Sequence, residues 1–168
     1  MASLNNKNLE EQIAEYAVKY KENYYRLAYS YVKNADDALD IVQESIYKAI
    51  SSASSLKNPD YIKTWLYRIV VNTSLDFLRK PKKNVAFDEE ILESHDFETV
   101  DTYGNFDLQK ALDNLPEKYR TVVILRYFED LKIDEIAEIL NENFNTIKTR
   151  LYKSLEKLGI KLSYYEEV

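Results

Sequence analysis

Apolar residues recur at helical spacing along most of the chain, and this pattern is interrupted once, in the middle. The spacing predicts helices up to about Lys80, and the helical period returns at about Phe106. Between these points the sequence is polar and keeps no period. The pattern therefore predicts an all-α chain of two small helical domains. We call residues 1–80 the first block and residues 107–168 the second block, and a flexible linker over 81–106 is expected to join them.

Three helices of the first block can be placed from their apolar faces and end signals. One helix is predicted from a stripe of apolar residues at helical spacing, namely Tyr24, Leu27, Ala28, Tyr31 and Val32. Asn34 is a typical N-cap for the next helix. That helix should bury the face made of Ala38, Ile41, Val42, Ile46 and Ala49. A further helix is expected from near Asp60 to the residue before Pro81, which cannot continue it.

The second block has the pattern of a helix-turn-helix. Pro116 is well placed for the first turn of a helix. Farther along, two apolar faces are separated by the polar stretch 141–145: Ile136, Ala137 and Leu140 before it, and Ile147, Leu151, Leu155 and Leu158 after it. The second helix of such a pair often enters the major groove of DNA. By itself this motif indicates only a DNA-binding protein.

Composition supports helices and excludes several classes of protein. The chain of 168 residues has 2 glycines, 3 prolines and no cysteine, so disulfides and thiolate metal sites are ruled out. The segment 1–8 is polar and lacks the apolar core of a signal peptide, and no apolar stretch is long enough for a membrane span. We therefore expect a soluble, cytoplasmic protein.

The net charge of −6 is concentrated in the middle of the chain. Residues 81–107 carry 2 basic and 8 acidic side chains, whereas the flanking stretches are close to neutral. The stretch 146–161 contains five basic side chains and only one acidic side chain. That helix is suited to DNA phosphates, although a solvated amphipathic face would have the same composition.

Two groups of sequence strings, in this order, carry a resemblance. The first is Asp-Ala-Leu-Asp-Ile-Val-Gln-Glu at 37–44, followed by Thr-Trp-Leu-Tyr-Arg-Ile-Val-Val-Asn at 64–72. The second is Leu-Pro-Glu-Lys-Tyr-Arg at 115–120, which leads into the helix-turn-helix that ends near Leu151. Taken alone, the first string is also what an ordinary acidic outer face of a helix looks like. Together, the strings resemble a bacterial sigma factor of the small two-domain, extracytoplasmic-function (ECF) type. Two further strings, at 25–33 and 73–79, look most like members of this family from low-GC Gram-positive bacteria.

The resemblance implies three binding surfaces and no catalytic residue, metal or cofactor. Sigma region 2 would be the first block and sigma region 4 the second. The implied contacts with core RNA polymerase are Asp37, Asp40, Gln43 and Glu44. The implied contacts with the minus-ten promoter element are Ser51, Ser52, Ser54, Ser55, Lys63, Tyr67, Arg68, Asn72 and Arg79. The implied contacts with the minus-thirty-five element are Asn145, Thr146, Lys148, Thr149, Arg150 and Lys153.

The family also implies partners and a role. Core RNA polymerase and promoter DNA are the expected partners, together with an anti-sigma factor, expected to be membrane-anchored, that restrains the protein until envelope stress. Such a partner would hold the chain at the inner face of the membrane.

The linker is long enough to connect the two promoter sites. The two promoter elements lie roughly 58 Å apart, and the linker can span roughly 90 Å when extended. Its acidic character and its single histidine, His95, indicate a solvated segment rather than a metal site.

Three positions depart from the family pattern. Lys132 stands where a Ser or Thr usually caps the first helix of the pair, and Asn141 and Glu142 stand where the turn usually has glycine and an apolar residue. Asn tolerates the left-handed conformation that a tight turn requires. Two alternatives remain open on the residues alone: a helix-turn-helix regulator that acts without polymerase, and a sigma-like decoy that binds polymerase but starts no transcription.

Overall fold

The computed structural model describes residues 2–80 and 103–159, and side chains from residue 8 in the first of these ranges and from residue 108 in the second. The first block runs through α1 (Ala2–Lys19), α2 (Lys21–Val32), α3 (Ala35–Ser51), the 3-10 turns η1 (Ala53–Ser55) and η2 (Pro59–Tyr61), and α4 (Ile62–Arg79). The second runs through α6 (Tyr103–Asn114), α7 (Glu117–Val123), a π-helical turn (Ile124–Phe128), α8 (Ile133–Leu140) and α9 (Phe144–Lys157). Within the described ranges the chain is helical and contains no strand, as predicted.

Asparagine side chains cap the two helices that carry the main sequence motifs. The Asp37 backbone N–H donates to Asn34 Oδ1 at 2.9 Å, which fixes the start of α3. The Thr146 backbone N–H donates to Asn143 Oδ1 at 2.8 Å and fixes the start of α9. The predicted left-handed turn residue is also confirmed, because Asn141 ends α8 with φ 55° and ψ 46°. Local sequence chemistry thus sets these helix ends.

The helix-turn-helix forms despite the unusual residue at its first cap. Lys132 precedes α8, and its side chain does not replace the missing hydroxyl. Instead, the Lys132 backbone N–H donates to Glu135 Oε1 at 3.0 Å, which is half of a capping box. Two buried side chains of α8, Ile136 and Ile139, then pack toward α9 and α4. The carboxylate three residues into the helix compensates for the absent Ser or Thr.

The predicted buried faces are largely confirmed. Tyr24, Leu27, Ala28 and Tyr31 of α2 are buried, as are Ala38, Ile41, Val42 and Ala49 of α3. Val32 and Ile46 are only half-buried. The predicted linker 81–106, including His95, lies mostly outside the described residues; its last part, from Tyr103, belongs to α6. None of the described helices is long and apolar enough to cross a membrane.

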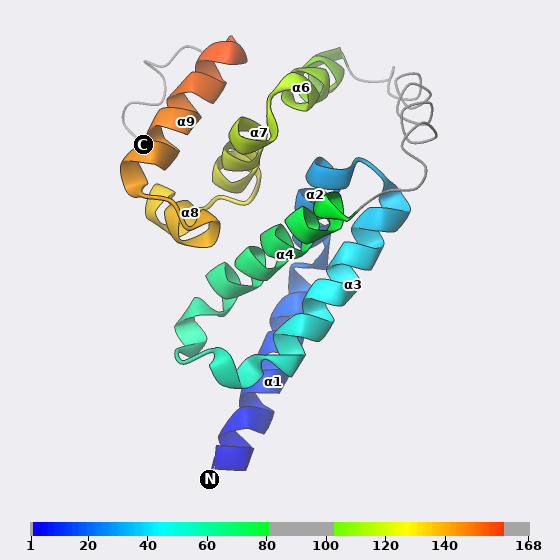
Figure 1. The fold of residues 1–168 in the computed structure, drawn as a ribbon, viewed down its shortest axis with the longest axis vertical. Coiled ribbons are helices and arrows are strands. Elements are labelled where there is room, and N and C mark those ends of the chain that lie inside the picture. Colours follow the sequence, from blue (N-terminus) through cyan, green and yellow to red (C-terminus); the bar gives the residue numbers. More distant parts are fainter. Residues whose placement is uncertain (1, 81–102, 160–168) are drawn as a thin grey trace.

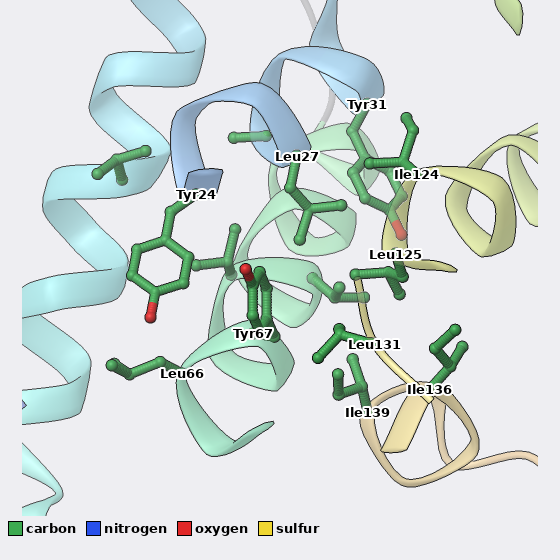
Figure 2. Close-up of a cluster of buried hydrophobic side chains, with 14 of the residues drawn as sticks. Tyr24, Leu27, Tyr31, Leu66, Tyr67, Ile124, Leu125, Leu131, Ile136 and Ile139 are labelled. Carbon is green, nitrogen blue, oxygen red and sulfur yellow. The ribbon is translucent and has the colours of Figure 1, made fainter. Parts of the chain in front are cut away.

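The two blocks pack against each other and share one hydrophobic core. In Figure 1, α8 lies beside α4, and α7 lies beside α2. Figure 2 shows side chains of the first block facing side chains that follow α7 in the second. The labelled core residues are Tyr24, Leu27, Tyr31, Leu66, Tyr67, Ile124, Leu125, Leu131, Ile136 and Ile139. A smaller cluster of Leu112, Leu115 and Val123 belongs to the second block alone.

Candidate functional site

The acidic face of α3 is solvent-exposed along most of its length. Asp40, Gln43 and Glu44 are exposed, and Asp37 is half-buried in the first turn. Glu44 Oε1 lies 3.6 Å from Lys48 Nζ, with both side chains close to half exposed, so this ion pair restricts the carboxylate only weakly. The predicted polymerase-binding residues therefore form one accessible acidic strip.

An apolar hollow adjoins this strip and was not predicted from the sequence. Helices α1 and α3 line it, with Val18 on one side and Leu39, Gln43 and Ile46 on the other. Val18 is 78% exposed and Leu39 is 42% exposed, so both apolar side chains are accessible to a partner. The signal was present in the sequence, because Leu39 lies off the apolar face of α3 and directly precedes Asp40. The strip and the hollow together form a mixed acidic and apolar surface.

Three serine hydroxyls, at the end of α3 and in the compact turn that follows it, bond to backbone carbonyls of the same segment. Ser51 Oγ donates to the Tyr47 carbonyl at 2.8 Å, and Ser52 Oγ donates to the Lys48 carbonyl at 2.6 Å. Ser55 Oγ donates to the Ser52 carbonyl at 2.6 Å. Ser51, Ser52, Ser54 and Ser55 are nevertheless all exposed, while Ala53 beneath them is buried. The hydroxyl oxygens remain available as acceptors at the surface.

The predicted minus-ten residues of α4 divide between two environments. Arg68, Asn72 and Arg79 are exposed, and Lys63 is half-buried. Tyr67 differs from these, because only 1% of it is exposed. Its role in strand binding stays a prediction. That role requires the second block, which packs around Tyr67 in the shared core, to move away.

The Tyr67 hydroxyl is bonded to Glu129, from the turn between α7 and α8, while the ring lies in the shared hydrophobic core. Tyr67 Oη donates to Glu129 Oε2 at 2.9 Å. Asn23 Nδ2 donates to the same oxygen at 2.6 Å, and Arg26 Nη1 lies 3.4 Å from Oε1. The carboxylate is thus fully buried between the blocks and held by three side chains of the first block. Sequence reasoning missed Glu129, Asn23 and Arg26, since no motif marks a contact that arises only when the blocks pack.

Buried tyrosines surround this contact, and burial changes their acidity. Burial raises the pKa of Tyr67 far above its ordinary value, and the neighbouring Glu129 carboxylate raises it further. Burial likewise raises the pKa of Tyr31, although a hydrogen bond with Thr121 partly opposes the effect. Thr121 Oγ1 donates to Tyr31 Oη at 2.9 Å, which is a second buried bond between the blocks. Neutral hydroxyls are therefore an integral part of the interface between the blocks.

Most of the predicted minus-thirty-five residues surround one surface hollow of about 430 Å³ at the start of α9. Its lining includes Asn145, Thr146, Thr149, Arg150 and Lys153. Tyr119 of α7 also lines it and was not predicted, although it lies inside the string at 115–120. Lys148 is exposed outside the hollow, with its ammonium 5.8 Å from the ring centroid of Tyr152. The structure thus gathers five of the six predicted residues at one place.

An ion pair holds the guanidinium at this hollow. Arg150 Nη2 lies 3.1 Å from Glu142 Oε1, and the Arg150 side chain is only 17% exposed. Glu142 belongs to the turn, at the position where its charge departed from the family pattern. The departure therefore has a structural role, which is to orient Arg150.

The described residues contain no group of three or more His, Cys, Asp or Glu side chains that could hold a metal ion. The described surfaces carry an acidic strip on α3, exposed basic and amide side chains on α4, and basic side chains on α9. These groups are suited to binding a protein and nucleic acid.

Comparison with known families identifies both blocks. Residues 17–84 match Sigma-70 region 2, and residues 105–158 match Sigma-70, region 4. RNA polymerase sigma factor SigV of Bacillus subtilis is 56% identical over 144 residues, covering 86% of this chain and 87% of the relative. The ECF RNA polymerase sigma factor SigW of the same organism is 33% identical over 154 residues, covering 83% and 82%.

Solved structures support the fold at greater sequence distance. CnrH, solved in complex with the cytosolic domain of CnrY, aligns with a TM-score of 0.65 at 18% identity, covering 92% of this chain and 94% of CnrH. The sigma factor RpoE of Bartonella quintana, solved with the anti-sigma factor NepR, also aligns with a TM-score of 0.65, at 21% identity, covering 90% and 98%.

Proposed function

This chain belongs to the ECF group of the sigma-70 family of RNA polymerase sigma factors, and we propose that it binds core RNA polymerase, directs it to promoters of an envelope-stress response and is restrained by an anti-sigma factor. The observation that carries the proposal is the presence of both regions, in order, in one chain. Region 4 alone would also fit a regulator that acts without polymerase. The polymerase-binding region makes initiation the function that fits the whole chain.

Docking on polymerase is assigned to the exposed strip of α3. Asp40, Gln43 and Glu44 present carboxylate and amide oxygens that suit arginine side chains of a partner, because charge-assisted hydrogen bonds to guanidinium groups are strong and directional. Leu39 and Val18 add an apolar surface beside them. A mixed surface of this kind gives both specificity and buried area.

Promoter binding is assigned to two surfaces, one in each block. The start of α9, with Thr149, Arg150 and Lys153 around its hollow, is suited to the groove and phosphates of the duplex minus-thirty-five element. The serine turn with Arg68 and Asn72 of α4 is suited to the unpaired minus-ten strand. We also propose contacts for the other residues that the family resemblance implies. The proposed minus-ten contacts are Lys63, Tyr67 and Arg79, and the proposed minus-thirty-five contacts are Asn145, Thr146 and Lys148.

Restraint by an anti-sigma factor is supported by membership of the ECF group. A structural relative, RpoE, was solved in complex with such a partner. A membrane-anchored partner would connect the chain to the cell envelope. This part of the proposal predicts that the chain is held at the inner face of the membrane until the partner releases it.

Transcription with purified core enzyme tests the proposed function. We expect the chain to convert core polymerase into an enzyme that starts at defined promoters. A regulator acting alone would give sequence-specific DNA binding without core polymerase, and a decoy would bind core polymerase and start nothing. Either of those results would overturn the proposal.

A further inference from the structure

The buried Glu129 carboxylate lies in a site built by the first block. Asn23 Nδ2 and Tyr67 Oη both donate to Oε2, at 2.6 and 2.9 Å, and Arg26 Nη1 lies 3.4 Å from Oε1. The Glu129 side chain has no exposed surface, whereas the Arg26 side chain remains 46% exposed. We call Asn23, Arg26 and Tyr67 the donor triad. An amide, a guanidinium and a phenol hydroxyl thus converge on one anion.

The fold of the second block fixes Glu129 in this position. The Glu129 backbone N–H donates to the Ile124 carbonyl at 3.0 Å, the five-residue bond of a π-helical turn. Asp130 follows in the left-handed conformation with φ 55°, and the Leu131 backbone N–H then donates to the Leu125 carbonyl at 3.0 Å. This backbone presents the carboxylate to the first block instead of continuing α7.

The donor triad belongs to the first block alone and would remain without an anion if the second block moved away. Asn23 and Arg26 are three residues apart on α2, so they share one face of that helix. Tyr67 comes from α4, which packs directly against α2. If the second block moved away, these three donors would lose their anion and face solvent, where they could bind another one. The separated first block would therefore carry a preformed anion site.

The site lies within the predicted path of the unpaired promoter strand. Tyr67 is one of the predicted minus-ten residues, and Lys63 lies one turn earlier on the same face of α4. The anion available along such a strand is the phosphodiester group, which guanidinium, amide and hydroxyl donors all bind well.

We propose that the donor triad is a phosphate-binding site for the single-stranded minus-ten DNA, and that Glu129 occupies it as an internal substitute for the phosphate while the two blocks are packed together. The proposal rests on the proposed function and adds a ligand and its regulation. In the closed chain the strand cannot reach Tyr67. Separation of the blocks removes the carboxylate and opens the site in one step.

A matched pair of substitutions in the full chain tests this proposal. Glu129→Gln removes the buried charge, and Asp130→Asn makes the same chemical change at the adjacent, exposed residue, where asparagine tolerates the left-handed backbone. The probe is a short fluorescent thymidine oligonucleotide, followed by anisotropy. We expect Glu129→Gln to bind it about tenfold more tightly than the unaltered chain, because losing a charge-assisted bond shifts the closed chain toward the open one. Asp130→Asn should bind like the unaltered chain.

A second substitution asks whether the gain comes from the donor triad. Adding Arg26→Gln to Glu129→Gln should return the affinity to that of the unaltered chain. Adding Lys118→Gln, which removes a similar charge from an exposed residue of the second block, should leave most of the gain. An oligonucleotide with uncharged methylphosphonate linkages should show no gain, since its bases are unchanged and its phosphates no longer carry charge.

Separation of the blocks is measured independently. The chain has no cysteine, so cysteines placed at the exposed residues Lys57 and Glu156 can carry a dye pair for energy transfer. Glu129→Gln should lengthen the distance between the dyes. If that variant fails to fold by circular dichroism, Thr121→Val serves instead, because it breaks a buried bond between the blocks that does not involve Glu129, the bond to Tyr31. It should produce the same gain, and Arg26→Gln should again abolish that gain.

Three outcomes would overturn the proposal: an opened chain with no gain in affinity, a gain that persists without Arg26, or an equal gain with the uncharged oligonucleotide. An opening variant that leaves both the distance and the affinity unchanged would overturn it as well. Transcription with core polymerase separates this result from the proposed function. If the unaltered chain starts transcription while the triad binds no phosphate, only the present inference fails.

Discussion

Two tyrosines in contact in the core show how one hydroxyl can stabilise and another destabilise the same structure. The rings of Tyr24 and Tyr67 meet edge to face with centroids 5.1 Å apart. The Tyr67 hydroxyl donates to Glu129, whereas the Tyr24 hydroxyl is buried and has no hydrogen-bond partner among the described residues. A buried hydroxyl without a partner is unfavourable, and its removal is often neutral or stabilising.

Substituting each tyrosine with phenylalanine should therefore have opposite effects on the free energy of unfolding. We expect Tyr24→Phe to raise it by up to about 1 kcal/mol, and Tyr67→Phe to lower it by about 1.5–3 kcal/mol because a bond to a charged group is lost. Urea denaturation near pH 7 measures both. A loss of stability in Tyr24→Phe larger than that in Tyr67→Phe would contradict this assignment.

The same tyrosines predict a loss of stability at alkaline pH. Burial raises the pKa of Tyr24 well above its ordinary value of 10.0, so above about pH 10 the unfolded chain releases that proton before the folded chain does. Ionisation of Tyr24 therefore costs the folded chain nothing below that pH, and it lowers the free energy of unfolding as the pH rises from there toward the higher folded pKa. Tyr24→Phe should show a shallower decline in melting temperature between about pH 9 and pH 11 than the unaltered chain. An identical decline would show that other groups cause it.

Glu142 also acts at the residue scale, through Arg150. Their 3.1 Å ion pair orients the guanidinium at the start of α9, so Glu142→Ala should loosen it. We expect discrimination between a cognate promoter and one with a changed minus-thirty-five base pair to fall, by up to about 1–3 kcal/mol if Arg150 contacts a base edge. Glu138→Ala, which removes an exposed carboxylate from α8, is the matched control. Competition binding by the complete polymerase measures both, and equal discrimination in the two variants would contradict the role of the ion pair.

Helix α3 has two faces with different roles: the buried face stabilises the fold, and the exposed face is proposed to bind polymerase. Its buried face, with Ile41 and Val42, packs into the core, while Asp40 and Glu44 project from the opposite face. Changes on the exposed face should therefore alter binding and leave the fold intact, because surface substitutions usually change stability by within about 0.5 kcal/mol.

Reversing the charge at Asp40 and Glu44 to lysine should abolish binding to core polymerase without changing helicity. The physical reason is repulsion from the basic partner surface that the strip is proposed to face. Lysine at Asp36 and Glu22, exposed acidic residues outside the proposed polymerase-binding set, provides a control with the same change in charge. Affinity for core polymerase that is unaltered in the Asp40 and Glu44 variant would remove α3 from the docking surface.

At the scale of the whole molecule, the packing of the blocks opposes promoter binding by both at once. Tyr67 is inaccessible while the blocks are packed and Glu129 accepts its hydrogen bond, and the two promoter elements lie roughly 58 Å apart along the duplex. We therefore expect core polymerase to separate the blocks. The distance between dyes at residues 57 and 156 should lengthen when core polymerase is added to the otherwise unaltered chain. An unchanged distance in a complex that starts transcription would show that the packed arrangement is the active one.

The helices, the caps of α3 and α8 and most of the buried faces could be predicted from residues close together in the sequence. Asn34 caps α3 as predicted, and Asn141 takes the left-handed conformation, because these features depend on residues within a few positions of one another. The exposed positions of α3 could be predicted for the same reason, since helical periodicity decides which side chains lie outside. The strings that carry the family resemblance are likewise local, and they were sufficient to identify it.

The contact between the two blocks could not be predicted before the fold was known. Glu129 lies 62 residues from Tyr67 and 106 from Asn23, and no spacing rule connects residues that far apart. An acidic residue in a turn is expected to face water, because burying a charge is unfavourable unless donors surround it. Those donors are assembled only when α2 and α4 pack together and the second block closes over them. For that reason Tyr67 looked accessible in the sequence and is buried in the fold.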